Sequence, residues 1–139
     1  MTVRHFTVEQ ANQTLPLVER IVADILGDYD TWRDRMGRYE LLSAGATGES
    51  GESPEQIALR NEIDDAAHRI NGYMEELSQI GCIFKGFEQG LVDFYSKQDG
   101  REVFLCWKHG EPAVEHWHEL DGGFSGRQPV DAESPRSEG

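Results

Sequence analysis

Two histidines near the end of the chain have the spacing of metal ligands. His116 and His118 are two residues apart, so on a β-strand both imidazoles point to the same face of a sheet. Asp93 lies in an earlier segment rich in β-branched and aromatic residues, and a neighbouring strand would carry its carboxylate to that face. Because two imidazoles and a carboxylate suit Zn or Fe(II), we predict a divalent metal site of Asp93, His116 and His118.

The expected strand registers extend this ligand set. A two-residue turn at Asp99-Gly100 places Asp93 opposite Cys106. If the loop 108–112 then brings Trp107 opposite Ala113, Cys106 lies opposite Val114 and on the histidine face. Cys106 or Glu119 is therefore the predicted further ligand, and the alternative is a pair of ordinary strand histidines, one exposed and one hydrogen-bonded.

A small-ligand site over the segment 91–127 is the broader form of this hypothesis. Glu111 precedes Pro112 in a tight turn, where it can act as a ligand or cap local N–H groups. Arg127 follows a glycine-rich loop, where it can meet an anion or pair with a nearby acid. The predicted ligand-binding residues are Asp93, Glu111, His118, Glu119 and Arg127.

Enzymatic chemistry has weaker support in the sequence. The chain has no phosphate-binding loop, dinucleotide fingerprint, nucleophile elbow or paired-cysteine motif. A hydrolase or lyase would have to use His118 as general base, with Glu111 or Glu119 as its partner. The sequence therefore favours a binding protein and assigns no catalytic residue.

The first half of the chain predicts two helices that position this segment. Thr7 with Gln10, and Ser53 with Gln56, have the spacing of capping boxes. Because proline suits only the first turn of a helix, we expect a short turn at about 8–13 and a longer helix from near Thr14. Steps of three and four place apolar residues on one stripe, which comprises Leu15, Val18, Val22, Ile25, Tyr29, Trp32, Met36 and Tyr39. A second stripe comprises Ile57, Ile63, Ala67, Ile70, Met74 and Leu77.

The second half predicts an antiparallel sheet that packs on these helices. Strands are expected at 91–95, 102–107 and 113–118, and 82–84 can add a fourth. The fold class is therefore α+β, with a long antiparallel helical hairpin on a small antiparallel sheet of three or four strands. We expect a single domain over 1–129, with the hairpin at 7–81 and the sheet at 82–129, followed by a disordered tail at 130–139.

Composition limits the partners of the protein. The 139 residues include 26 acids and 13 bases, which gives a net charge of −13. Such a surface repels nucleic acid and anionic membranes, and the sequence contains no apolar run of the roughly 18–20 residues that span a bilayer. The N-terminal segment has no apolar signal region and the two cysteines form no disulfide framework, so we expect a soluble cytoplasmic protein.

Two helices alone rarely bury both stripes, so we also predict a homodimer through the hairpin. An assembly module without a ligand is the alternative function.

Several short motifs resemble a bacterial family of uncharacterised proteins that is described only as a domain of unknown function. The motifs are Phe6-Thr7, Ala11-Asn12, Leu15-Pro16-Leu17-Val18, Gly90-Leu91-Val92-Asp93-Phe94, Leu105-Cys106-Trp107, Gly110-Glu111-Pro112, Trp117-His118-Glu119, Gly123-Phe124 and Arg127. The resemblance covers about residues 5–130 and implies no activity. It does imply that His118 belongs to the family motif and His116 does not. A site shared by the family would then combine His118 with Glu111, Glu119, Asp93 or Arg127.

Overall fold

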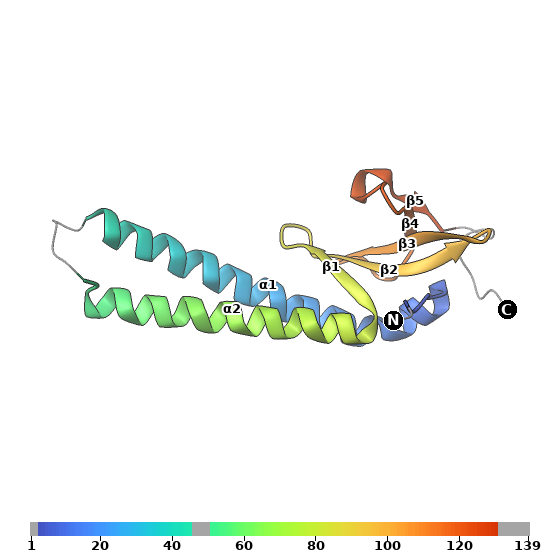
Figure 1. The fold of residues 1–139 in the computed structure, drawn as a ribbon. Coiled ribbons are helices and arrows are strands. Elements are labelled where there is room, and N and C mark those ends of the chain that lie inside the picture. Colours follow the sequence, from blue (N-terminus) through green and yellow to red (C-terminus); the bar gives the residue numbers. More distant parts are fainter. Residues whose placement is uncertain (1–2, 46–50, 131–139) are drawn as a thin grey trace.

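The fold was analysed in a computed structural model, which describes residues 3–45 and 51–130. Two long helices precede an antiparallel sheet, as predicted, but the sheet has five strands where three or four were expected. The elements are α1 (Val8–Ala44), α2 (Pro54–Ile80), β1 (Cys82–Gly86), β2 (Leu91–Gln98), β3 (Arg101–Lys108), β4 (His116–Glu119), the 3₁₀ helix η1 (Phe124–Gly126) and β5 (Gln128–Pro129). The strands lie in the order in which they occur in the chain (Figure 1).

Local capping explains where the helices begin and end. Thr7 and Ser53 each accept a hydrogen bond from the backbone N–H three residues later, and the side chains of Gln10 and Gln56 complete both capping boxes. Helix α2 ends at Gly81, whose φ of 114° is the left-handed conformation that favours glycine. Both capping boxes and the end of α2 at Gly81 were predicted from the sequence and are confirmed, whereas the long first helix begins at Val8 and not near Thr14.

The predicted helix break before Pro16 is wrong, because α1 runs through this proline without interruption. Tertiary contacts hold the first turns in place despite the missing N–H of Pro16. Ala11, Leu15 and Val18 are buried on both sides of the proline. The Asn12 side chain also accepts a hydrogen bond from Val114 N at 2.7 Å and donates to Val114 O at 3.3 Å. Packing against the sheet therefore outweighs the local preference of proline.

The buried stripe of α2 differs in part from the predicted one. Ile70 and Leu77 are buried as expected, but Ile57 is 41% exposed and Leu59 and Ala66 are buried instead. The spacing from Leu59 through Ala66, Ile70 and Leu77 follows a seven-residue repeat, which keeps one seam of α2 against α1. The packing partner of α2 is thus α1 along most of its length.

The hairpin β2–β3 has the predicted register. Asp99 and Gly100 both have positive φ, 54° and 80°, and Gln98 pairs with Arg101 across this two-residue turn. Asp93 consequently lies opposite Cys106. The Asp-Gly signal fixed this register because both turn residues tolerate the conformation that the hairpin needs.

The register of β4 is shifted by two residues from the expected one. Cys106 lies opposite His116 and not opposite Val114. The reason is that Val114 does not pair with β3, because both of its backbone polar groups bond to the Asn12 side chain. A shift of two residues preserves the face to which each side chain points, so His116 and His118 still share a face with Cys106.

The last strand, β5, was not predicted. Gln128 pairs with Trp117, Pro129 pairs with His116, and Val130 N donates to Glu115 O at 2.8 Å. Two residues are too few for an alternating pattern to reveal a strand. Of the predicted tail, Val130 packs against the core, and 131–139 lie outside the described residues.

The two faces of the sheet have different roles. One face packs on the helices, and it contributes Val92, Phe94, Val103, Leu105, Trp107 and Trp117 to the main hydrophobic core. The opposite face carries Asp93, Cys106 and His118, which are buried but lie outside that core. The sheet covers one end of the hairpin, and the other end projects beyond it (Figure 1). Over the residues that the structure describes, neither helix combines the length and hydropathy that a membrane crossing requires.

Candidate functional site

Three buried side chains from adjacent strands form a cluster with the donor atoms of a metal site. Asp93 comes from β2, Cys106 from β3 and His118 from β4. One ligand atom of each lies within 4.8 Å of the other two. The residues are 3%, 1% and 2% exposed respectively, so a carboxylate, a thiol and an imidazole meet inside the protein. We call them the Asp93–Cys106–His118 cluster.

The hydrogen bonds of His118 orient its ring toward Asp93. Its Nδ1 lies 2.7 Å from Glu119 O, and because a carbonyl oxygen only accepts, Nδ1 donates the hydrogen. The other nitrogen, Nε2, lies 3.1 Å from Asp93 Oδ1. In the absence of a metal, one hydrogen must lie between His118 Nε2 and Asp93 Oδ1, because two facing lone pairs cannot form a hydrogen bond. Phe104 flanks the ring with 5.4 Å between centroids, which fixes its orientation further.

The third member, Cys106, is held in the thiol form. Burial, followed by the negative charge of Asp93, raises the pKa of Cys106 to about 12. The other cysteine, Cys82, also has a pKa of about 12, which burial alone raises. Both cysteines are free and buried, but among the residues that the structure describes only Cys106 has potential co-ligands beside it.

Neither thiol is therefore expected to react quickly with iodoacetamide in the native protein. The thiolate is the reactive form, and burial suppresses both its formation and its access. Mass spectrometry after a short pulse should find both cysteines unmodified at neutral pH and both alkylated after unfolding in urea. Fast labelling of Cys106 in the folded protein would contradict this account of its surroundings.

A second polar group lies beside the cluster and involves Glu111, Arg127 and His116. Glu111 Oε1 accepts hydrogen bonds from the Arg127 guanidinium at 2.6 Å and from Lys108 N at 2.7 Å. The guanidinium also donates to Cys106 O at 3.2 Å and lies 4.9 Å from the centre of the Phe124 ring. His116 Nδ1 is 3.6 Å from Glu111 Oε2, which is beyond hydrogen-bonding distance. Arg127 thus fixes the 120–127 segment to the middle of the sheet.

The predicted site residues consequently separate into three groups. Asp93 and His118 meet, with Cys106. Glu111, His116 and Arg127 form the neighbouring group. Glu119 belongs to neither of these groups, because it lies on the Val103 side of the sheet and pairs with Arg101 at 2.6 Å. Successive residues of a strand point to opposite faces, so His118 and Glu119 could not both face one ligand.

The ion pair of Glu111 predicts a specific dependence of stability on pH. Burial acts to raise the pKa of Glu111, but the hydrogen bonds from Arg127 and Lys108 N lower it overall below the usual 4.5. Its contribution is complete above that value and is lost as the pH falls through the lower folded-state pKa. We expect Glu111→Gln to cost about 1–2 kcal/mol at neutral pH and to cost little at strongly acidic pH, as measured by urea unfolding.

Glu119→Gln is the matched control for this measurement. Glu119 also bonds to an arginine, but its side chain is 43% exposed. Solvent screens such a pair, so its loss should change stability less than the loss of Glu111. Equal effects of the two substitutions at neutral pH would show that burial does not strengthen the Glu111 pair.

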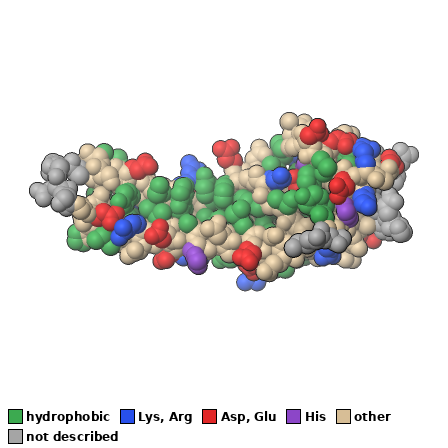
Figure 2. Space-filling model, viewed as in Figure 1, with side chains coloured by type: hydrophobic (Ala, Val, Ile, Leu, Met, Phe, Trp, Pro, Cys, Tyr) green, Lys and Arg blue, Asp and Glu red, His purple; other side chains and the backbone are tan. Residues whose placement is uncertain are grey.

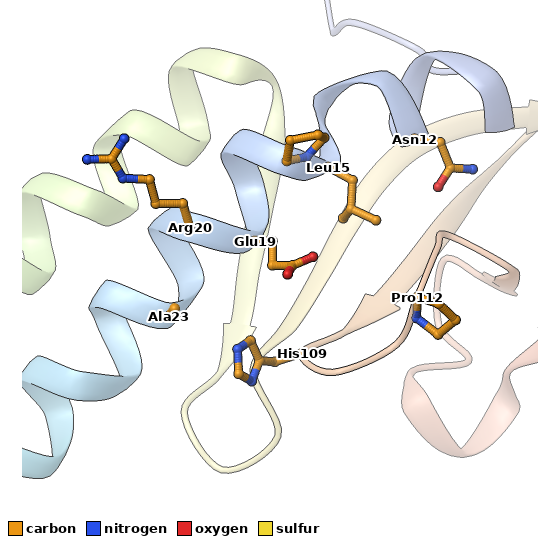
Figure 3. Close-up of a pocket in the computed structure, with 8 residues that line it drawn as sticks. Asn12, Leu15, Glu19, Arg20, Ala23, His109 and Pro112 are labelled. Atoms are coloured by element: carbon orange, nitrogen blue, oxygen red, sulfur yellow. The ribbon is translucent and has the colours of Figure 1, made fainter.

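A groove on another part of the surface contains none of the predicted site residues. It has a volume of about 580 Å³ and lies between α1 and the loop that joins β3 to β4 (Figure 3). Its lining residues are Asn12, Leu15, Pro16, Glu19, Arg20, Ala23, His109 and Pro112. The chemistry of the groove is therefore separate from the Asp93–Cys106–His118 cluster, and the ligand atoms of the cluster are enclosed.

Sequence reasoning missed two supporting residues. Asn12 positions Val114 from 102 positions away in the sequence, and Phe104 lies directly opposite His118. The Phe104 contact depends only on the β3–β4 register and would have followed from the correct loop length. No sequence signal pairs Asn12 with Val114, because the contact depends on how the helix and the loop pack.

Comparisons with known proteins agree with the resemblance seen in the motifs. A search among curated proteins and a search among solved structures each found no match. One family model matches residues 4–130, which is most of the chain and includes every residue of the Asp93–Cys106–His118 cluster. The protein therefore belongs to the family described as uncharacterized conserved protein, DUF2203.

Proposed function

We propose that this protein binds a divalent transition metal, Zn²⁺ in the first instance, through Asp93, Cys106 and His118. The observation that supports the proposal is the convergence of three different ligand atoms within 4.8 Å from three neighbouring strands. This set differs from the one first predicted, since Cys106 takes the place of His116. His116 instead lies beside Glu111.

The orientation of His118 supports metal binding. A metal-ligating imidazole commonly donates its other N–H to a carbonyl or carboxylate, which fixes the tautomer. Here Nδ1 donates to Glu119 O, and Nε2 is left facing Asp93 and Cys106. A metal at this point would replace the proton that otherwise lies between His118 and Asp93.

The charge balance also suits a dication. A carboxylate and a thiolate carry two negative charges between them, so the pair would neutralise a divalent ion and leave no net charge buried. The nearby Arg127 is already neutralised by Glu111 at 2.6 Å. The site would therefore avoid the cost of an unpaired charge in the protein interior.

The donor types favour zinc among common metals. Thiolate and imidazole select softer transition metals, whereas Mg²⁺ and Ca²⁺ prefer sites made entirely of oxygen. Three protein ligands leave a position for a further ligand on a four-coordinate zinc ion. When bound, the metal would supply Lewis acidity, and the protein would supply orientation and exclusion of water.

The geometry gives less support to His118 as a general base. Both ring nitrogens are engaged within the protein, and the ring is almost completely buried. A general base needs a nitrogen within hydrogen-bonding reach of the substrate.

Because both thiols are free, we also place the protein in the cytoplasm, where thiols stay reduced.

The direct test is metal binding by untagged protein. We expect Co²⁺ to give a thiolate-to-cobalt absorption band and Zn²⁺ to abolish it by competition. His118→Ala should weaken Zn²⁺ binding by about 100-fold or more, which corresponds to the loss of roughly 2.7 kcal/mol. Isothermal titration calorimetry measures the affinity, and circular dichroism checks that each variant is folded.

His116→Ala is the matched control because it removes the neighbouring histidine of the same strand. Its Zn²⁺ affinity should stay within a few-fold of the wild-type value. A cobalt complex without the thiolate band would remove Cys106 from the ligand set. Equal losses in the two histidine variants would restore the set that includes His116, and no binding by the wild type would refute the proposal.

A further inference from the structure

The apolar stripe of α1 continues beyond the part of the hairpin that the sheet covers. Leu15, Val18, Val22 and Ile25 are buried on this stripe. The next four members, Tyr29, Trp32, Met36 and Tyr39, are only half-buried although they follow the same spacing. The sheet therefore covers the stripe only to about residue 25, whereas the apolar stripe continues to Tyr39.

The lengths of the elements explain this difference. Helix α1 has 37 residues, which at about 1.5 Å per residue is roughly 55 Å. The longest strands have 8 residues, or about 26 Å. The sheet thus reaches along about half of the hairpin, and Figure 2 shows a continuous band of apolar side chains running along the remainder.

Helix α2 contributes to the same uncovered surface. Tyr29, Trp32 and Phe87 border a small apolar hollow of about 200 Å³ with Ala67, Ile70 and Asn71 of α2. The Tyr29 ring stacks with both the Trp32 and the Phe87 rings, with ring centroids 6.0 and 4.3 Å away. We define the distal apolar face as Tyr29, Trp32, Met36, Tyr39, Ile63 and Ala67.

We propose that the distal apolar face binds the same face of a second copy of this chain. Two antiparallel hairpins packed face to face make a four-helix bundle, and a two-fold axis makes each copy cover the other equally. The apolar hollow beside Trp32 would receive a side chain of the second copy. This proposal does not depend on the metal site, which lies on the far side of the sheet from the helices.

The area and the charges of the face suit such a dimer. Three of the six residues are aromatic, and an aromatic side chain covers about 150–250 Å² in full; because all six are only partly exposed, the face offers on the order of 300 Å². With its polar rim, such an interface would be smaller than the roughly 800 Å² per partner of an ordinary specific complex, which suits a weak and reversible dimer. Both signs of charge are present on the distal hairpin, where Arg35 pairs with Glu62, Arg38 with Asp34 and Arg60 with Glu52.

The net charge adds a signature that a test can use. Each copy carries −13, so two copies repel each other at long range, and salt screens this repulsion. Association through an apolar face should consequently become tighter as the salt concentration rises. A contact that depended mainly on ion pairs would respond in the opposite direction.

The test is analytical ultracentrifugation of the full chain across the micromolar range at low and high salt. We expect a reversible dimer that salt strengthens. Trp32→Lys should weaken it at least tenfold, and Met36→Lys should do the same without removing an aromatic ring. Leu41→Lys is the control, since Leu41 is on the same helix but is 75% exposed and outside the distal apolar face; it should dimerise like the wild type.

Three results would overturn the proposal. The wild type could be a monomer at every concentration and salt level, which would leave a different protein as the partner of this face. The dimer could survive both lysine substitutions with unchanged affinity, or Leu41→Lys could weaken it as much as Trp32→Lys. Melting by circular dichroism verifies folding, and Met36→Lys decides the matter if Trp32→Lys does not fold.

Discussion

Asp93→Leu is expected to cost about 3–5 kcal/mol of the free energy of unfolding in metal-free protein. Asp93 and His118 lie 3.1 Å apart, and their side chains are 5% and 3% exposed. Removing the carboxylate leaves the imidazole buried without its partner, and a buried polar group that loses its hydrogen bond keeps the full cost of desolvation. Urea unfolding in the presence of a chelator measures the loss.

A double-mutant cycle separates this contact from simple packing. His118→Leu should also destabilise the protein strongly, because it leaves Asp93 buried and Glu119 O without its donor. The double variant Asp93→Leu, His118→Leu should be more stable than the sum of the single losses predicts, by about 1–3 kcal/mol. Strictly additive losses would mean that the two side chains do not depend on each other.

The parts of the fold that could be predicted from sequence are those fixed by neighbouring residues. The Thr7 and Ser53 capping boxes act over three residues, and Gly81 ends α2 through its own backbone conformation. Asp99-Gly100 sets the β2–β3 register because the turn joins the strands directly. In each case the deciding interaction lies within a few positions along the chain.

The parts that could not be predicted depend on contacts between distant segments. Pro16 stays inside α1 because buried neighbours and the bonds between Asn12 and Val114 hold the helix against the sheet. The same bonds remove Val114 from the sheet and move β4 by two residues relative to β3. One tertiary contact thus accounts for both errors.

Part of the candidate site could be predicted from the sequence for the same reason. The Asp-Gly turn brought Asp93 and Cys106 together, and the parity of β4 put His118 on their face. The register alone does not exclude His116, because His116 lies directly opposite Cys106; its ring is instead beside Glu111, with Nδ1 3.6 Å from Glu111 Oε2. The odd or even position of a residue along its strand decides the face to which its side chain points. Only the full strand register and the loop contacts decide which side chains on that face touch each other.

The proposed metal site and the metal-free Asp93–Cys106–His118 cluster would share one geometry. Without a metal the cluster is a buried polar network that joins three strands, and the proton between Asp93 and His118 keeps it neutral. With a metal the same atoms would coordinate the ion, and that proton and the Cys106 proton would leave. The metal would therefore stabilise a fold that already forms the site.

Zinc is expected to raise the free energy of unfolding by about 4 kcal/mol when its free concentration is a thousand times the dissociation constant. The folded state gathers the ligands and the unfolded state separates them, so binding favours folding. Because the pKa of Cys106 is raised to about 12, the metal must displace a proton from the thiol at neutral pH. At a constant zinc concentration, the gain in the free energy of unfolding should consequently increase as the pH rises. Thermal unfolding with and without zinc measures this gain.

Cys106→Ser and Cys82→Ser form the matched pair for this last measurement, since both replace a free, buried thiol of similarly raised pKa. Cys82 lies in the main core and donates a hydrogen bond to Leu77 O; it is opposite Phe94, on the other face of the sheet from Asp93. Each substitution can lower the stability of the metal-free protein, so the quantity to compare is the increment that zinc adds to each variant. We expect that increment to be unchanged in Cys82→Ser and almost absent in Cys106→Ser. An equal increment in both variants would mean that zinc stabilises the protein from some other place, and the buried cluster would then be a structural network alone.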